Sequence, residues 1–424
     1  MENCKKLINF LDKSYTCYHA INNLEEMLVK AGFEKLTEFN PWALETGKNY
    51  YVIKNSSSII AFKVPANLEN SGFQIVASHS DSPSYKIKPN GVIVDKRNDY
   101  TKLNTEPYGG MIDTTWLDRP LGIAGRVVLN NNGNLIEQVI TLDETIIIPN
   151  VAIHLNRPQT PTLNPQVDML PIIGSSDASF SDMLNKKTNG KEIVSSDLYL
   201  YNKETACFVG ANNEYIASGR IDDLECAYAS IDALINATPK NITVCGVFNH
   251  EEVGSRSNNG AASTFLKDTL EKIMLSFDLD KYTTLASSVI ISADNAHAVH
   301  PNHPEKSDPT NNVYMNKGIV IKHQAGLSYT TDALSDAIFK MICKEANVPY
   351  QDYTNRSDMR GGGTLGSISL GQVSIHSVDI GLAQLAMHST YETTGTVDLE
   401  YMLNALNKYY STKIIISDNG VFFE

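Results

Sequence analysis

The first ninety residues change from a helical to a strand-like hydrophobic pattern. Residues 3–32 carry apolar side chains at helical spacing, and the pattern ends at Gly32. Runs rich in β-branched and aromatic residues then predict three strands. These runs are NYYVIKN at 49–55, SIIAFKV at 58–64 and FQIVASH at 73–79.

The pattern changes after residue 89. Residues 90–214 are rich in Asn, Thr, Pro and Gly, and their apolar runs, such as GRVVL and ETIIIP, are short and strand-like. Helical periodicity is scarce there, apart from ASFSDMLNK at 178–186. This pattern predicts a separate β-rich unit inserted into the chain.

From about residue 215, helical and strand-like segments alternate. Helices are predicted in DLECAYASIDALINA and TVDLEYMLNALNKYY, and buried strands in ITVCGVF, SSVIISA and QVSIHSVDIG. Such alternation predicts an α/β sheet covered by helices on both faces. We therefore expect residues 1–89 and 215–424 to form one α/β domain, interrupted by the β-rich domain at 90–214.

Composition and charge exclude several classes of partner. The chain has 424 residues and a net charge of −13, so it repels the phosphate backbone of nucleic acids. The sequence contains no apolar run long enough to span a bilayer, and its first residues lack the apolar core of a signal peptide. The six cysteines form no CxxC pair, which is typical of free thiols in a reducing compartment. We expect a cytoplasmic protein that binds neither nucleic acid nor membranes.

Acidic and histidine residues stand at the ends of the predicted α/β strands or at the start of a helix. They are His79 with Asp81, Asp222 or Asp223, Glu251 with Glu252, Asp294, and His388. Because open α/β sheets bind ligands at the carboxyl ends of their strands, we expect these side chains to converge. Taken singly, Asp294 has the alternative of a helix cap, and His388 that of a packed core histidine.

The residue types indicate a metal site. Histidine nitrogens with carboxylate oxygens favour zinc, manganese or cobalt over magnesium or calcium. Two histidines and three carboxylates suffice for two divalent ions that share one carboxylate. Adjacent side chains at a strand end point in different directions, so one glutamate of the Glu251–Glu252 pair can bind metal while the other acts as a general base. His79 and Asp81 share a face, so Asp81 can accept a hydrogen bond from the imidazole and orient it.

Several blocks resemble the signature blocks of the M18 aminopeptidases, the aspartyl aminopeptidase family. They are SHSDSP, SGRIDDL, HEEVGS, SADNAHAVHPN, NRSDMRGGGTLG and LAMHSTYE, within a match from about residue 10 to 415. The resemblance implies a mixed sheet of the zinc-peptidase type and two metal ions, with zinc expected and cobalt or manganese as alternatives. It implies that His79 and Asp294 bind one ion, that Glu252 and His388 bind the second, and that Asp222 bridges the two ions. It also implies that Glu251 is the general base and that Asp81 orients His79.

The resemblance also implies an oligomer and a substrate class. The insert at 90–214 corresponds to a dimerisation domain, and family members assemble as tetrahedral dodecamers. His154, in VAIHLNR, would enter a neighbouring subunit's site and stabilise the oxyanion. The family prefers an N-terminal Asp or Glu, for which Lys317, in MNKGIVIKH, would supply the positive charge.

The predicted function is a dinuclear metal-dependent aminopeptidase that removes the N-terminal residue of peptides, either Asp or Glu or other residues. One alternative is a related co-catalytic peptidase of the glutamyl or deblocking type, and another is a catalytically idle oligomeric scaffold. A panel of aminoacyl substrates distinguishes the first alternative, and metal content distinguishes the second. A serine hydrolase is a distant alternative, because the neighbours Ser, His and Asp of SHSDS cannot form a triad and the sequence shows no nucleophile elbow.

Overall fold

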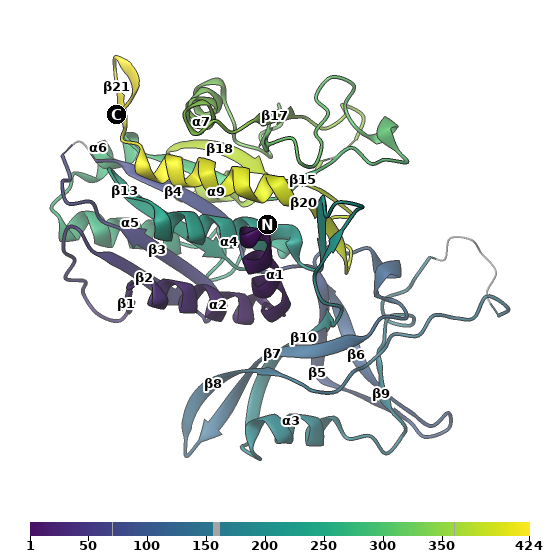
Figure 1. Ribbon diagram of the computed structural model, residues 1–424. Coiled ribbons are helices and arrows are strands. Elements are labelled where there is room, and N and C mark those ends of the chain that lie inside the picture. Colours follow the sequence, from purple (N-terminus) through teal and green to yellow (C-terminus); the bar gives the residue numbers. More distant parts are fainter. Residues whose placement is uncertain (70, 156–161, 360) are drawn as a thin grey trace.

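A nine-stranded mixed sheet forms the centre of the computed structural model, which describes residues 1–69, 71–155, 162–359 and 361–424 (Figure 1). Four central strands run parallel to one another and are almost entirely buried: β13 (Ile242–Phe248), β4 (Phe73–His79), β14 (Val289–Ala293) and β18 (His376–Gly381). Continuous apolar runs such as ITVCGVF suit strands that are covered on both faces. In spatial order the strands are β1 (Glu34–Leu36), β2 (Asn49–Lys54), β3 (Ser58–Lys63), β13 (Ile242–Phe248), β4 (Phe73–His79), β14 (Val289–Ala293), β18 (His376–Gly381), β16 (Ile319–Lys322) and β17 (Tyr350–Tyr353).

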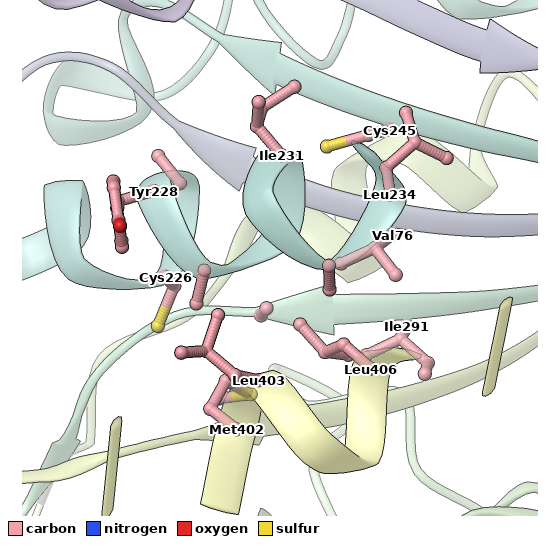
Figure 2. Close-up of a cluster of buried hydrophobic side chains, with 14 of the residues drawn as sticks. Val76, Cys226, Tyr228, Ile231, Leu234, Cys245, Ile291, Met402, Leu403 and Leu406 are labelled. Atoms are coloured by element: carbon pink, nitrogen blue, oxygen red, sulfur yellow. The ribbon is translucent and has the colours of Figure 1, made fainter. Parts of the chain in front are cut away.

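Helices cover both faces of this sheet, as predicted. Because successive strand residues point to opposite faces, Val76 packs into one hydrophobic core and its neighbour Ile75 into the other. The first core is formed with α1 (Glu2–Lys13), α2 (Cys17–Lys30), α4 (Ile221–Asn236), α7 (Ala333–Ala346) and α9 (Thr396–Ser411). Figure 2 shows part of it, where Leu234 and Leu406 face Val76. The second core is formed with α5 (Phe265–Ser276), α6 (Lys281–Ala286) and α8 (Leu365–Leu370).

A separate six-stranded antiparallel sheet lies beside the first one and has its own hydrophobic core (Figure 1). Its strands in spatial order are β8 (Asn134–Thr141), β7 (Leu121–Asn131), β10 (Ile193–Asn202), β5 (Ser84–Asp95), β6 (Tyr100–Tyr108) and β9 (Ile172–Gly174), with α3 (Phe180–Thr188) and the 3₁₀ turn η1 (Asp113–Trp116). These strands span 84–202, within and slightly before the stretch predicted to be β-rich. The domain limits at 89 and 215 stay a prediction.

A small five-stranded sheet links the two larger ones, and the hydrophobic pattern did not predict it. Its strands are β11 (Cys207–Val209), β12 (Tyr215–Ser218), β20 (Glu392–Gly395), β19 (Ala383–Leu385) and β15 (Ala296–His297). Strands of two to four residues are too short to show alternation of apolar and polar residues. The C-terminal hairpin of β21 (Ile414–Ser417) and β22 (Gly420–Phe423) forms a sheet of its own and packs against the first core. Two further 3₁₀ turns in the described part of the chain are η2 (Glu251–Val253) and η3 (Pro304–Lys306).

Two findings bear on the expected environment of the chain. Within the described ranges, no helix is both long and apolar enough to cross a membrane. The six cysteines are all free thiols, and only Cys207 is exposed.

Candidate functional site

Neighbouring parallel strands bring four of the predicted site residues to one edge of the central sheet. His79 is the last residue of β4, and Asp294 directly follows β14. Glu251 and Glu252 form the 3₁₀ turn just beyond β13. Since β13, β4 and β14 are adjacent and parallel, their carboxyl ends meet at this edge.

The small sheet brings the other two predicted ligands to the same place. Asp222 lies in the first turn of α4, just after β12, and His388 lies in the loop between β19 and β20. Glu392, at the start of β20, accepts hydrogen bonds from the backbone N–H of Asp222 at 3.1 Å and of His388 at 2.7 Å. One buried carboxylate thus fixes both segments, and sequence reasoning missed it because β20 was not predicted.

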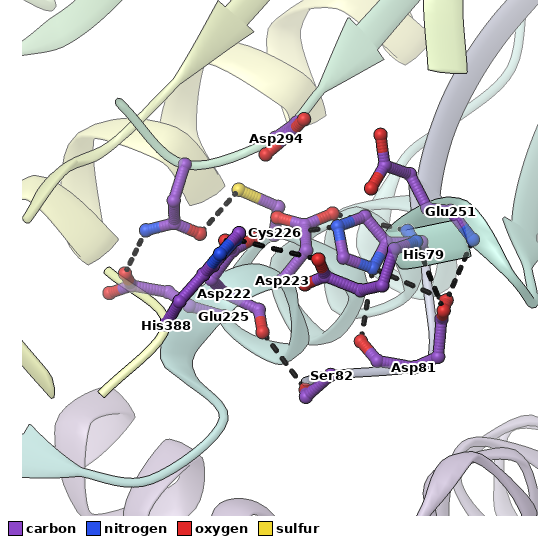
Figure 3. Close-up of polar contacts among 12 residues, drawn as sticks. His79, Asp81, Ser82, Asp222, Asp223, Glu225, Cys226, Glu251, Asp294 and His388 are labelled. Carbon is purple, nitrogen blue, oxygen red and sulfur yellow. Dashed lines mark hydrogen bonds and ion pairs between the residues drawn. The ribbon is translucent and has the colours of Figure 1, made fainter. Parts of the chain in front are cut away.

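Asp222 lies between the two histidines (Figure 3). One of its carboxylate oxygens is 3.4 Å from Nε2 of His79, and the other is 3.4 Å from Nε2 of His388. The His388 Nε2 atom is also 3.4 Å from a carboxylate oxygen of Glu252. Candidate ligand atoms within 4.8 Å of one another form two groups that share Asp222: one adds His79 and Asp294, and the other adds Glu252 and His388.

These residues fit a pair of divalent metal ions. Oδ1 of Asp222 and Oε1 of Glu252 are buried and have no hydrogen-bond partner among the described residues. Buried carboxylate oxygens without donors are costly unless a cation takes their place. Carboxylates with imidazole nitrogens are the donor set that zinc, manganese and cobalt accept.

The charges in the cluster lead to the same conclusion. Burial and the surrounding carboxylates raise the pKa of Glu251 to about 8 and that of Asp294 to about 6. They also hold the pKa of Glu252 well above its usual range. Burial opposes ionisation of Asp222 as well, but contacts with His388 and His79 keep its pKa below the usual range. So many carboxylates in one buried place repel one another, and bound cations would relieve that repulsion.

Asp81 connects the imidazole of His79 to the turn that carries the two glutamates. Nδ1 of His79 is 3.0 Å from the Asp81 carbonyl oxygen and 3.5 Å from its carboxylate. The same carboxylate accepts the backbone N–H groups of Glu251 at 3.1 Å and of Glu252 at 3.2 Å. Acceptors at Nδ1 favour the tautomer that leaves Nε2 free for a metal. Next to this group, Asp223 accepts the backbone N–H of His79 at 3.1 Å and does not take the place of Asp222.

The cluster faces a cavity of about 430 Å³ that also contains a buried lysine. Lys322, the last residue of β16, has its ammonium group 3.8 Å from Asp294 and donates to the backbone oxygen of Asn295 at 2.7 Å. The attraction of Asp294 outweighs the effect of burial and raises the pKa of Lys322 above its usual range, so the side chain stays charged. Besides the predicted ligands and Glu251, the lining residues include Gly110, Asn295, His297, Lys322, Tyr329, Tyr353 and Met387.

Two predicted residues lie elsewhere. Lys317 is exposed and does not line this cavity, so Lys322 is the lysine of the block MNKGIVIKH that the structure brings to the metal cluster. His154 is exposed in the six-stranded sheet's part of the chain, next to residues 156–161, which lie outside the described residues. Its predicted role requires a second subunit. His297 lines the cavity, whereas His300 lines a neighbouring one.

Comparison with known proteins gives one consistent result. The family model described as "Aminopeptidase I zinc metalloprotease (M18)" matches residues 10–410. A "Probable M18 family aminopeptidase 2" from Clostridium novyi is 43% identical over 426 residues, which cover 96% of this chain and 98% of that protein. The protein of the same description from Clostridium acetobutylicum is 42% identical and covers 97% of this chain and 99% of its own length.

Solved structures show the same fold. A chain of the Ape4 and Nbr1 complex superposes with a TM-score of 0.89 at 31% identity, covering 96% of this chain and 84% of that one. A chain of the S. cerevisiae mApe1 dodecamer superposes with a TM-score of 0.82 at 24% identity, covering 96% and 95%. The predicted α/β fold class is confirmed by these similarities and by the mixed sheet itself.

Proposed function

Because this chain belongs to the M18 family of aminopeptidases, we propose that its acidic cluster binds two zinc ions. We also propose that the enzyme removes an N-terminal Asp or Glu from peptides. The enzyme class, a metallo-aminopeptidase, follows from family membership. The number of ions, their ligands and the residue preference are our proposals. The observation that supports these proposals is the position of Asp222. One of its carboxylate oxygens lies 3.4 Å from His79, and the other lies 3.4 Å from His388.

Each ion would have its own ligands and share Asp222. We assign His79 and Asp294 to one ion and Glu252 and His388 to the other, in agreement with the two groups of close ligand atoms that share Asp222. A further group in the described residues joins Glu251 to His79 and Glu252, which places Glu251 next to both ions. When bound, two such ions acidify a water molecule and polarise the carbonyl of the first peptide bond.

Glu251 would move the proton. Its carboxylate lines the cavity beside the ligands and accepts no hydrogen bond from the described residues, so it is free to take a proton from water. Once it has taken that proton, Glu251 would give it to the leaving amine.

Lys322 would select an acidic substrate. Its ammonium group is buried in the same cavity, and its nearest carboxylate, Asp294, is assigned to a metal ion. Once that carboxylate is neutralised by metal, Lys322 offers its charge to an acidic side chain of the substrate. We propose Lys322 for this role in place of Lys317, which is exposed outside the cavity.

We also propose a homo-oligomer in which 90–214 dimerises and His154 of the partner subunit stabilises the oxyanion. Exposed apolar residues on the six-stranded sheet support a contact there: Val92, Val94, Leu135, Ile136 and Val194. A relative of the same fold is described as a dodecamer. The catalytic part would then consist of 1–89 and 215–424.

The test is an assay of the metal-free and metal-supplemented enzyme on Asp-, Glu-, Leu- and Lys-p-nitroanilides, together with metal analysis of the purified protein. We expect two ions per chain and faster cleavage of Asp and Glu. Preference for the Glu substrate alone would favour the glutamyl type, and equal cleavage of all four substrates would favour the deblocking type; either result would leave the metallo-aminopeptidase. A content well below two ions per chain in excess zinc would refute the dinuclear site.

A further inference from the structure

One turn of the six-stranded sheet contacts residues of both predicted ion sites. The turn comprises residues 108–112, sequence YGGMI, and it follows directly from β6. We infer that the 108–112 turn is a positioning element for both metal ions: it orients His388 directly and His79 through Asp81. This inference rests on the proposed dinuclear function and gives the inserted sheet a role in the metal site besides subunit contact.

The first contact fixes the ring and the backbone of His388. Nδ1 of His388 is 2.5 Å from the carbonyl oxygen of Gly110, and the backbone oxygen of His388 accepts the N–H of Ile112 at 3.1 Å. A carbonyl can only accept, so Nδ1 donates to Gly110, and Nε2 is the nitrogen that faces Asp222 and Glu252 and would bind the metal. His388 needs this restraint, because it has a left-handed backbone (φ 67°) and its side chain is the most exposed of the proposed ligands, at 32%.

The second contact fixes Asp81. The Tyr108 hydroxyl donates to Oδ2 of Asp81 at 2.7 Å, and this carboxylate also accepts the N–H groups of Glu251 and Glu252. Tyr108 is the side-chain donor from the inserted sheet in this network. Without its hydroxyl, the buried carboxylate would lose a charge-assisted hydrogen bond and would hold His79 and the glutamate turn less firmly.

The third contact explains why a glycine stands at position 109, between Tyr108 and Gly110. Gly109 has a left-handed backbone (φ 79°), and a Cβ there would lie 3.1 Å from Cβ of Glu252 and 3.4 Å from Cα of Pro83. The turn therefore rests directly on a proposed metal ligand. A side chain at 109 would push the turn and Glu252 apart, and it would also strain the backbone.

The test measures metal binding and turnover separately. Tyr108→Phe and Gly109→Ala are stripped of metal, and zinc affinity is measured in competition with a chromophoric chelator. Loss of such supporting contacts typically weakens metal binding about 10- to 100-fold. We expect at least one of the two zinc dissociation constants to rise by about tenfold in each variant, and turnover to recover as zinc is added, with KM for the peptide unchanged.

Matched controls come from the same sheet. Tyr100→Phe alters an exposed tyrosine at the other end of β6, and Gly133→Ala alters a left-handed glycine with no atom within 4 Å of its added Cβ. Zinc affinities of both test variants within twofold of these controls would overturn the inference. If Gly109→Ala does not fold, Tyr108→Phe decides, because it keeps the aromatic ring. A wild-type chain that binds fewer than two zinc ions would refute the proposed function instead.

Discussion

Lys322→Met gives the sharpest test of substrate selection, because Lys317→Met is a matched control from the same short block. Each change removes one ammonium group, and the two positions are five residues apart, but only Lys322 lines the metal cavity. Met keeps much of the length of the side chain and is accepted in buried places.

The expected loss of activity follows from the distance between the Lys322 ammonium group and Asp294. The 3.8 Å between the Lys322 ammonium and Asp294 corresponds to about 4 kcal/mol at an effective dielectric constant of about 20. A substrate carboxylate at a similar distance would gain a comparable attraction, reduced by the cost of removing it from water. A net loss of about 2–3 kcal/mol would lower kcat/KM for Asp substrates by roughly 30- to 150-fold.

The assay compares kcat/KM for Asp- and Leu-p-nitroanilide at saturating zinc. We expect Lys322→Met to reduce the Asp value by that factor and to change the Leu value far less, while Lys317→Met changes neither ratio. Equal losses on both substrates would show that Lys322 supports Asp294 and does not select the substrate. A selective loss in Lys317→Met would instead support Lys317, the lysine predicted from the sequence.

Three further predictions concern the proton carrier, the metals and pH. Glu251→Gln should retain both zinc ions but lower kcat by about 10²–10⁴-fold, and near-normal turnover with full metal content would remove Glu251 from its role. Chelation should lower the melting temperature, since zinc at about 1,000 times its dissociation constant adds about 4 kcal/mol to the free energy of unfolding; an unchanged melting temperature would contradict a buried metal site. Burial raises the pKa of Glu225, Glu251 and Glu392 from near 4.5 to about 8 each, so the folded metal-free chain holds protons that the unfolded chain releases. The free energy of unfolding of the metal-free chain should therefore fall as pH rises from about 5 to 8. A melting temperature that rises over this range would refute the raised pKa values of these three glutamates.

The sequence predicted well those features that depend on parallel strands. Continuous apolar runs indicated β4, β13 and β14, and each is followed by the residues that the structure brings together at one edge. This inference needs only the alternation of strands and helices, because parallel neighbours present the same end to the same side.

Lys322 could not be found by the same rule. β16 runs antiparallel to β18, and Lys322 pairs with Asp379 in the interior of that strand. Its long side chain reaches back to Asn295 and Asp294 at the metal edge. Strand direction is decided by tertiary packing, so two lysines five positions apart in one block were not distinguishable from the sequence.

The small sheet and the 108–112 turn were missed for related reasons. Glu392 and Gly110 act through backbone hydrogen bonds, which depend on where a loop lies and leave no pattern in residue type.

The path of the chain through the six-stranded sheet limits how the protein can be dissected. The chain enters that sheet at Ser84, five residues after His79, and it leaves from Asn202 toward Asp222. A shortened version that joins the two flanks would therefore cut beside a ligand at one junction and discard Tyr108 and Gly110. The insert is thus no detachable accessory module: any shortened version would have to keep both junctions and the 108–112 turn, which together hold the segments around His79, Asp222 and His388.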